Sequence, residues 1–153
     1  MTLRVFKDFG FVDWADDEDV TNAMLMAAAL EIDSGLIDAR LGGFLLKKRV
    51  AMPGRGKSRS WRVIVAWKQG ERLFFLHGFA KSEKDNITQK EKAALTRLAE
   101  VYMGYDDATL AEIVADGDLL EVKTDVKMVF IRGNEADLET RHTRLYKKYL
   151  ARP

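Results

Sequence analysis

The spacing of apolar positions is helical at the start of the chain. Five apolar or aromatic residues between Val5 and Trp14 gather on one side of a helical wheel, which predicts an N-terminal helix. The acidic run Asp16–Asp19 offers caps for a second helix, because carboxylates accept hydrogen bonds from the first free N–H groups of a helix. That second helix is expected over Val20–Ile32, which is rich in Ala, Met and Leu and stops near Gly35.

The spacing then shortens to that of β-strands. A first strand is expected from Phe44 through Val50, followed by the turn residues Pro53–Gly56. β-Branched and aromatic residues dominate Trp61–Trp67 and Leu73–Phe79, which predicts two more strands. Short connections between these strands indicate an antiparallel meander. Both faces of the last two strands are apolar, so helices are expected to cover the sheet.

Helical spacing returns in the last part of the chain. Thr88 and Glu91 form a capping-box pattern ahead of apolar residues at helical spacing up to Tyr102. A short helix is expected over Asp107–Ala115, and a further strand over Leu119–Val122. Helices on both sides of a run of strands predict a compact α+β domain.

Charge is distributed very unevenly along the chain. The sequence has 25 Lys and Arg residues against 24 Asp and Glu, so its formal net charge is only +1. Residues 41–70 nevertheless contain no acid and eight basic residues: Lys47, Lys48, Arg49, Arg55, Lys57, Arg59, Arg62 and Lys68. Removing these eight charges from the net of +1 leaves −7 for the rest of the chain. Such a segment favours a polyanion as partner, although a solvated charged loop gives the same pattern.

Composition excludes several classes of protein. A chain of 153 residues with 47% hydrophobic content fits one domain. The absence of Cys excludes a disulfide framework and a thiolate zinc site, and no His, Asp and Glu cluster has the spacing of metal ligands. The longest apolar run, Ala23–Leu30, is too short to span a bilayer, and no secretory leader is visible. A cytoplasmic protein without a membrane partner is therefore expected.

Four groups of residues, taken together, resemble a known family. They are Leu41–Gly43, the run Lys47–Ser58 with its Pro53–Gly54-x-Gly56–Lys57–Ser58 turn, the strand residues Arg62–Ile64, and Phe74–Ile87 with its Gly78–Phe79–Ala80–Lys81 centre. In this order and spacing they resemble the RelE/HigB-like toxins of bacterial type II toxin–antitoxin systems. The resemblance covers Val5 to Val122. A Walker A phosphate loop is excluded because Ala51 stands where its first Gly is required.

The resemblance implies both a fold and a function. The fold is a RelE-like compact domain, with N-terminal helices packed on a twisted antiparallel sheet, C-terminal helices and a concave basic face. It is expected over residues 1–124. Residues 125–153 form an unmatched C-terminal extension, in which a strand (Val126–Ile131) and an amphipathic helix (Glu135–Leu150) are expected. The implied function is a ribosome-dependent, metal-free mRNA endonuclease without a cofactor, neutralised by a cognate antitoxin protein. Its other partners are the ribosome and mRNA.

The implied reaction assigns roles to individual residues. The ribose 2′-OH attacks its own 3′-phosphate, which requires in-line positioning, a proton acceptor and cations against the developing phosphorane charge. Arg62 matches the family's strand arginine and would stabilise that charge. Arg55 and Lys57 match the cationic loop before it, with Lys57 as candidate base. Lys81 would donate a proton or clamp a phosphate. The expected RNA-binding residues are Lys47, Lys48, Arg49, Arg59 and Lys68.

Several of these interpretations have a structural alternative. Arg62 shares its strand face with apolar residues, so a structural arginine paired with a carboxylate is the alternative to a catalytic one. His77 lies among aromatic residues, where packing is more usual than catalysis. Trp61 and Trp67 either stack on bases or pack in the core. For the whole protein, the alternatives are a non-catalytic RNA-binding protein and a toxin with another target, such as gyrase.

Overall fold

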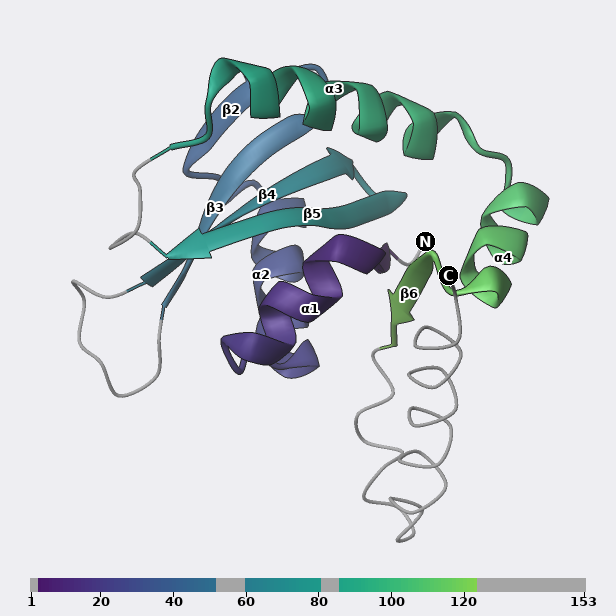
Figure 1. The fold of residues 1–153 in the computed structure, drawn as a ribbon, viewed down its shortest axis with the longest axis horizontal. Helices are drawn as coiled ribbons and strands as arrows, with labels where there is room; N and C mark the ends of the chain where they lie inside the picture. Colours follow the sequence, from purple (N-terminus) through teal and green to yellow (C-terminus); the bar gives the residue numbers. More distant parts are fainter. Residues whose placement is uncertain (1–2, 52–59, 81–85, 124–153) are drawn as a thin grey trace, which may run out of the picture.

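The computed structural model describes residues 3–51, 60–80 and 86–123, which form one six-stranded sheet with helices on both faces (Figure 1). The elements follow in the order β1 (Arg4–Asp8), α1 (Phe9–Asp17), α2 (Asn22–Asp33), β2 (Ala39–Gly42), β3 (Leu45–Ala51), β4 (Ser60–Lys68), β5 (Arg72–Ala80), α3 (Gln89–Gly104), α4 (Asp107–Asp116) and β6 (Leu119–Val122). Helices α1 and α2 cover one face of the sheet and α3 the other (Figure 1). The predicted α+β class is confirmed.

The strands lie in the order β2-β3-β4-β5-β1-β6. Strands β3, β4 and β5 form the expected antiparallel meander, β2 extends it by one strand that was not predicted, and β1 pairs antiparallel with β6. β1 also pairs with β5, but in parallel, with Arg4 opposite Arg72. The sheet is therefore mixed, and the expectation of a purely antiparallel sheet needs this one correction.

The predicted N-terminal helix begins later than expected. Residues Arg4–Asp8 form strand β1, and α1 starts only at Phe9. Val5 and Phe6 are both buried, but they pack into the cores on opposite faces of the sheet, which is the two-residue period of a strand. Asp8 then ends the strand and caps α1 by accepting a hydrogen bond of 3.0 Å from the Gly10 amide.

The second helix is capped by Thr21 and not by the acidic run. The Thr21 hydroxyl accepts a 3.2 Å hydrogen bond from the Met24 amide, and α2 runs from Asn22 to Asp33. Asp16 and Asp17 belong to the last turn of α1, and Asp19 has a left-handed φ of 60°. The predicted caps were wrong because a cap must directly precede the first helical residue, and Val20 and Thr21 intervene.

The C-terminal elements agree with their predictions. Thr88 and Glu91 form the capping box in front of α3, with bonds of 3.0 Å and 2.8 Å in the two directions. Helix α4 and strand β6 have the expected positions. Between them Gly117 adopts a left-handed φ of 87°, as is usual where a helix ends.

Two hydrophobic cores flank the sheet. One lies beneath α1 and α2 and includes the buried residues Phe11, Leu25, Ile32, Val63 and Phe75. The other lies beneath α3 and α4 and includes Phe6, Ile64, Phe74, Leu110 and Leu119. Neighbouring residues of a strand point to opposite faces of the sheet. A strand residue that alternates with members of the second core therefore lies on the same face as α3.

Trp61 and Trp67 pack on the α1–α2 side of the sheet. The Trp61 indole N–H donates a 2.9 Å hydrogen bond to Glu18, and that of Trp67 donates a 2.9 Å bond to Asp33. Asp33 also accepts a 2.9 Å bond from the Gly70 amide in the β4–β5 turn. Both indoles therefore hold the ends of α1 and α2 against β4. This agrees with packing in the core, one of the two interpretations, and not with stacking on bases.

Candidate RNA-binding face

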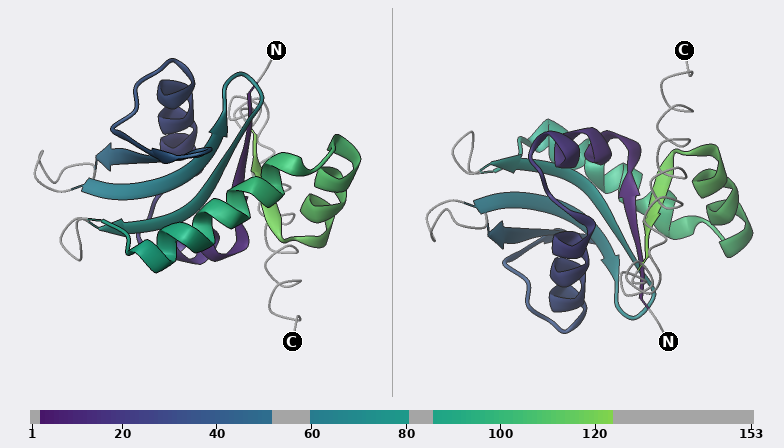
Figure 2. Two further views of the ribbon diagram at one scale, coloured as in Figure 1. Left: turned by 90° about the horizontal axis from the view of Figure 1, so that it is seen from above. Right: turned by 90° about the horizontal axis from the view of Figure 1, so that it is seen from below.

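Among the described residues, one end of the sheet is not covered by α3 on the side that this helix occupies (Figure 2). Ala51 of β3 pairs with Ser60 of β4, and Trp61 pairs with Ala80 of β5, so three strands end together. Figure 2 (left) shows α3 crossing the sheet obliquely and leaving these ends of β3 and β4 uncovered. Segments 52–59 and 81–85, which lie outside the described residues, are joined to the domain at this end.

Two arginines lie side by side on this open surface. Arg49 of β3 is directly opposite Arg62 of β4, and Arg62 is opposite Phe79 of β5. Directly opposed residues in an antiparallel pair have Cα atoms about 4.5–5.5 Å apart. Phe79 belongs to the core beneath α3, so this row of residues faces the α3 side.

Neither arginine forms an ion pair with a carboxylate within the part of the chain that the structure describes. Arg62 donates a 2.5 Å hydrogen bond from Nη1 to the Ser60 hydroxyl, and the main-chain N–H of Arg49 donates to the Asp38 carboxylate. Like charges in directly opposed positions are unfavourable. The geometry therefore favours an external anion between the two guanidinium groups, and it gives no support to a carboxylate-paired, structural Arg62.

Lys47 and His77 extend this surface along the strands. Both are in register with Ile64, two residues from the Arg49–Arg62 pair, and both are partly exposed. His77 Nε2 is 3.9 Å from a carboxylate oxygen of Glu91 in the first turn of α3, and its ring lies 5.9 Å from that of Phe79. We call Lys47, Arg49, Arg62 and His77 together the basic face.

Two of the expected RNA-binding residues lie elsewhere. Lys48 is buried on the opposite side of β3, where its Nζ lies 2.8 Å from Glu31 and donates a 3.1 Å hydrogen bond to the Leu36 carbonyl. Lys68 lies at the far end of β4 and pairs with Glu71 at 3.4 Å. The six-residue separation from Arg62 corresponds to about 20 Å along a strand. The environment of Lys48 is that of a structural residue, since its charge already has a partner.

The remaining predicted site residues are not covered by the structure. Arg55, Lys57 and Arg59 belong to segment 52–59, and Lys81 begins segment 81–85, so all four lie outside the described residues. Their assigned roles stay predictions. Within the described residues, the structure brings together Lys47, Arg49 and Arg62, and it adds His77 with Glu91.

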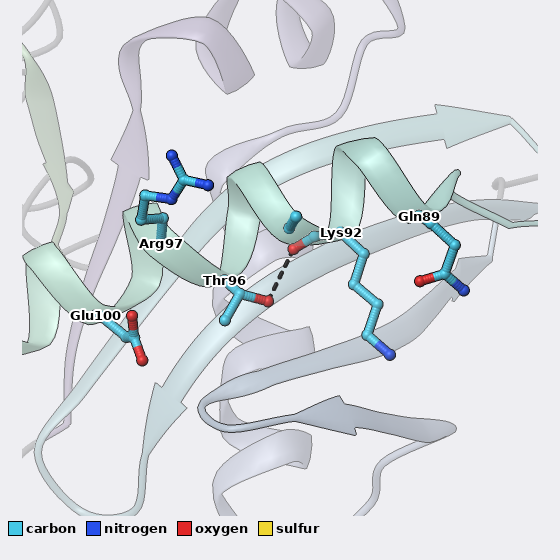
Figure 3. Close-up of a pocket in the computed structure, with 6 residues that line it drawn as sticks. Gln89, Lys92, Thr96, Arg97 and Glu100 are labelled. Atoms are coloured by element: carbon cyan, nitrogen blue, oxygen red, sulfur yellow. Dashed lines mark hydrogen bonds between the residues drawn. The ribbon is translucent and has the colours of Figure 1, made fainter.

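A separate depression of about 340 Å³ lies along α3. Its lining comes from α3 alone: Gln89, Lys92, Ala93, Thr96, Arg97 and Glu100. Figure 3 shows Lys92 and Gln89 on one side of the helix and Arg97 on the other, with the Thr96 hydroxyl bonded to the Lys92 carbonyl at 2.8 Å. One carboxylate and two cations around small side chains form no catalytic grouping, so the basic face remains the candidate site.

Comparison with known families identifies the scaffold. Residues 3–122 match the family model described as the RelE toxin of the RelE / RelB toxin-antitoxin system. The chain belongs to the RelE toxin family. The match ends where β6 ends and agrees with the resemblance seen in the basic segment. A member of this family has a cognate antitoxin as its partner. None of the functionally curated proteins matches the chain.

Two negative findings apply to the described part of this RelE domain. No three or more His, Asp or Glu side chains there are grouped so that they would hold a metal ion. None of the helices in the described ranges has the length and apolar character needed to cross a membrane.

Proposed function

We propose that this RelE toxin is an mRNA endonuclease and that Arg62 stabilises the phosphate charge that develops during cleavage. The observation that supports this most strongly is the register of Arg49 and Arg62, two directly opposed arginines, neither of which forms an ion pair with a carboxylate among the described residues. A guanidinium keeps its charge and presents paired N–H donors that match two phosphate oxygens. Arg62 lies on β4, one strand closer to the middle of the sheet than Arg49. We therefore assign the reacting phosphate to Arg62, and the neighbouring phosphates of the RNA backbone to Arg49 and Lys47.

The proposed reaction is an internal transfer at phosphorus. A bond forms between the ribose 2′-oxygen and the phosphorus while the bond from phosphorus to the 5′-oxygen breaks, which leaves a 2′,3′-cyclic phosphate and a free 5′-OH. One proton leaves the 2′-OH and one is added to the departing 5′-oxygen. The attacking 2′-OH restricts the substrate to RNA. Lys57 as base, Lys81 as acid and Arg55 as a second cation remain our proposals for segments outside the described residues.

The setting of the reaction is also part of the proposal. We infer that cleavage occurs on the ribosome in the cytoplasm, because the basic segment resembles that of the RelE/HigB-like toxins, many of which enter the ribosomal decoding site and cut mRNA there. Arg59 is proposed as a further RNA contact. The alternatives are a toxin that binds RNA without cutting it and a toxin with another target, such as gyrase.

Substitution of Arg62 tests the proposal. Arg62→Ala is expected to lower the rate of mRNA cleavage on ribosomes by about 10²–10³-fold while ribosome binding changes by less than threefold, because the lost contact acts mainly in the transition state. Arg49→Ala is expected to weaken binding and to reduce its salt dependence by about one counterion. Arg97→Ala, which removes an exposed arginine on α3, is the matched control.

Primer extension on a reporter mRNA is the measurement. Intact mRNA after toxin induction, together with arrested replication or altered DNA supercoiling, would show that the target is not RNA. Equal effects of Arg62→Ala and Arg49→Ala on binding alone would show that Arg62 holds RNA without acting in its cleavage.

A further inference from the structure

His77 is the member of the basic face to which the proposed reaction gives no role. It lies on β5, directly opposite Ile64 of β4, and its side chain is 34% exposed. Because Ile64 belongs to the core beneath α3, His77 faces the same side of the sheet as that helix. The ring is therefore accessible in part to a molecule bound on the basic face.

His77 and Arg62 lie diagonally across two adjacent strands. Arg62 is directly opposite Phe79, and His77 precedes Phe79 by two residues on the same face of β5. Diagonal neighbours of this kind are about 7–8 Å apart, a distance that long side chains can span. The His77 ring also lies 5.9 Å from the Phe79 ring. The buried Phe79 is therefore the neighbour that both polar side chains share.

Both polar side chains can donate hydrogen bonds to one anion beside Phe79. Arg62 donates from Nη1 to the Ser60 hydroxyl at 2.5 Å, but a guanidinium group has five N–H donors, so others remain for a ligand. An imidazole with a proton on each nitrogen is also a donor on both sides. Charged donors of these two kinds form strong hydrogen bonds with phosphate oxygens.

Glu91 in the first turn of α3 supplies a fixed negative charge beside the ring. Its Oε1 accepts a 2.8 Å hydrogen bond from the Thr88 amide in the capping box, and its Oε2 lies 3.9 Å from His77 Nε2. This contact is an ion pair when the imidazole is protonated, and it is longer than a hydrogen bond. Contacts between catalytic groups often shorten when the substrate binds. Because the cap holds the carboxylate, its charge meets the ring at a defined position.

We propose that protonated His77 donates a hydrogen bond to the phosphate that Arg62 contacts during mRNA cleavage, and that Glu91 orients the ring as a positioning residue. The hydrogen bond strengthens as negative charge develops on the phosphate oxygens, so it acts on the chemical step more than on binding. This inference rests on the proposed function and adds a second catalytic group to the same site. No proton leaves the ring, so the proton transfers assigned to Lys57 and Lys81 are unchanged.

Packing alone is a weaker explanation of His77. A ring that only fills space beneath α3 needs neither access to the basic face nor a carboxylate beside it. Among the described residues, the charged groups in its surroundings are Glu91 on α3, Arg62 on β4 and Lys47 on β3. A protonated imidazole near two cations and one carboxylate leaves an excess of positive charge, which a phosphate would balance.

Cleavage of mRNA on ribosomes by full-length variants tests the catalytic role. His77→Phe keeps an aromatic ring but has no N–H donor, so we expect kcat to fall by at least about tenfold and KM to change by less than about threefold. The wild-type rate should also fall more steeply with rising pH than the His77→Phe rate, because deprotonation removes the charged donor. His142→Phe, at the second of the two histidines and outside the family match, is the matched control and should cleave as wild type does.

Variants of Glu91 separate positioning from helix capping. Glu91→Gln keeps the capping box, in which Gln also serves, but removes the charge beside His77. It should lower kcat by about threefold or more without lowering the melting temperature. Glu91→Ala removes both the cap and the charge, so it should lower kcat and the melting temperature together. A Glu91→Gln toxin with the kcat of wild type would overturn the role of Glu91.

A measurement without RNA separates this inference from the proposed function. Inorganic phosphate, added at constant pH and ionic strength, should move the NMR signals of the His77 ring in wild type but not in Arg62→Ala, with His142→Phe to assign the signals. Such a movement in a toxin that leaves mRNA intact would support the shared anion site and reject mRNA cleavage as its use. Normal cleavage by His77→Phe, or His77 signals that do not respond to phosphate, would overturn the inference. If circular dichroism shows that His77→Phe does not fold, the phosphate titration decides alone.

Discussion

At the scale of single residues, Lys7 is the most unusual charge in the described structure. It lies in β1, between β5 and β6, with only 6% of its surface exposed, and its Nζ donates a 2.8 Å hydrogen bond to the Asn22 side-chain oxygen. Burial lowers the pKa of Lys7 below its ordinary value of 10.5, and the charge of Asp16 opposes this shift only in part. The folded domain therefore bears an unfavourable charge that the unfolded chain leaves in water.

Lys7→Met is expected to raise the free energy of unfolding by about 1–2 kcal/mol at pH 7, since an apolar side chain of similar length avoids this desolvation. Asn22 is exposed, so its side-chain oxygen can accept a hydrogen bond from water when Lys7 is replaced. Between the lowered pKa and 10.5 the unfolded chain binds more protons than the folded one, so wild-type stability rises with pH. The advantage of Lys7→Met should shrink accordingly from pH 7 to pH 10.

Urea unfolding at both pH values measures this difference, with Lys90→Met at an exposed position of α3 as control. A destabilised Lys7→Met protein, or an advantage that is independent of pH, would show that the Asn22 bond outweighs the burial of the charge.

The limits of sequence-based prediction are also clearest among neighbouring residues. Lys47, Lys48 and Arg49 look equivalent in the sequence, yet strand geometry sends Lys48 to the α2 side and its two neighbours to the basic face. The charge of the segment was thus predictable, but the face was not, because it depends on register with β4. The opposition of Arg49 to Arg62 and the approach of Glu91 to His77 arise from chain segments that only the tertiary fold brings together.

At the scale of elements, the long strands β4 and β5 were predictable because β-branched and aromatic residues fill them. The four-residue strand β2 was missed, since Ala39–Gly42 contains two small residues and ends in a glycine of positive φ. The sequence pattern predicts a helix where strand β1 lies, because five residues are too few to separate a helical period from that of a strand. Short elements acquire their structure from pairing partners, which are distant in the sequence.

The contact between α1 and β5 depends on a glycine. A Cβ atom on Gly78 would lie 2.3 Å from Trp14 Cζ3, far inside van der Waals contact. Trp14 in turn contacts Phe11 and Trp61, at ring-centroid distances of 5.4 and 6.5 Å, so its ring has little freedom to move. The missing side chain at Gly78 allows α1 to approach the sheet.

Gly78→Ala is therefore expected to destabilise the domain by about 2–3 kcal/mol, as overpacked cores usually are. Combining it with Trp14→Leu should recover part of the loss, because the smaller side chain vacates the contested space. Thermal unfolding of the two single variants and the double variant forms a double-mutant cycle. Strict additivity of the two effects would contradict the proposed contact.

At the scale of the whole molecule, two arginines fasten the C-terminal elements to the sheet. Arg4 binds both oxygens of Glu121 in β6 at 3.0 and 3.1 Å. Arg72 donates to the carbonyl oxygens of Tyr102 and Tyr105 at 3.2 and 2.6 Å and to Asp107 at 3.2 Å. α3, α4 and β6 thereby become one body with the central strands.

Acid is expected to weaken this attachment. Burial alone would raise the pKa of Glu121, but the hydrogen bonds and charge of Arg4, with a contribution from Lys123, lower it below the ordinary 4.5. A lowered folded-state pKa stabilises the domain above pH 4.5, and this contribution is lost as the pH falls through the lowered value. Melting temperatures between pH 7 and pH 3 should fall less steeply for Glu121→Gln than for wild type. Exposed Glu112→Gln should follow wild type; identical slopes in all three proteins would rule out the Glu121 contribution.

The position of β1 between β5 and β6 has a consequence for synthesis. The first strand made finds its neighbours only when the chain has reached Arg72–Phe75 on one side and Leu119–Val122 on the other. Hairpin β3–β4 pairs locally and can form much earlier, but the second core remains open until β6 is made. Contacts between distant segments form late and slowly. The cationic hairpin β3–β4 of a growing chain therefore leaves the ribosome long before the domain is complete. The folded toxin exists only after β6 has been translated, so its appearance is delayed by the time needed to translate the residues between β4 and β6.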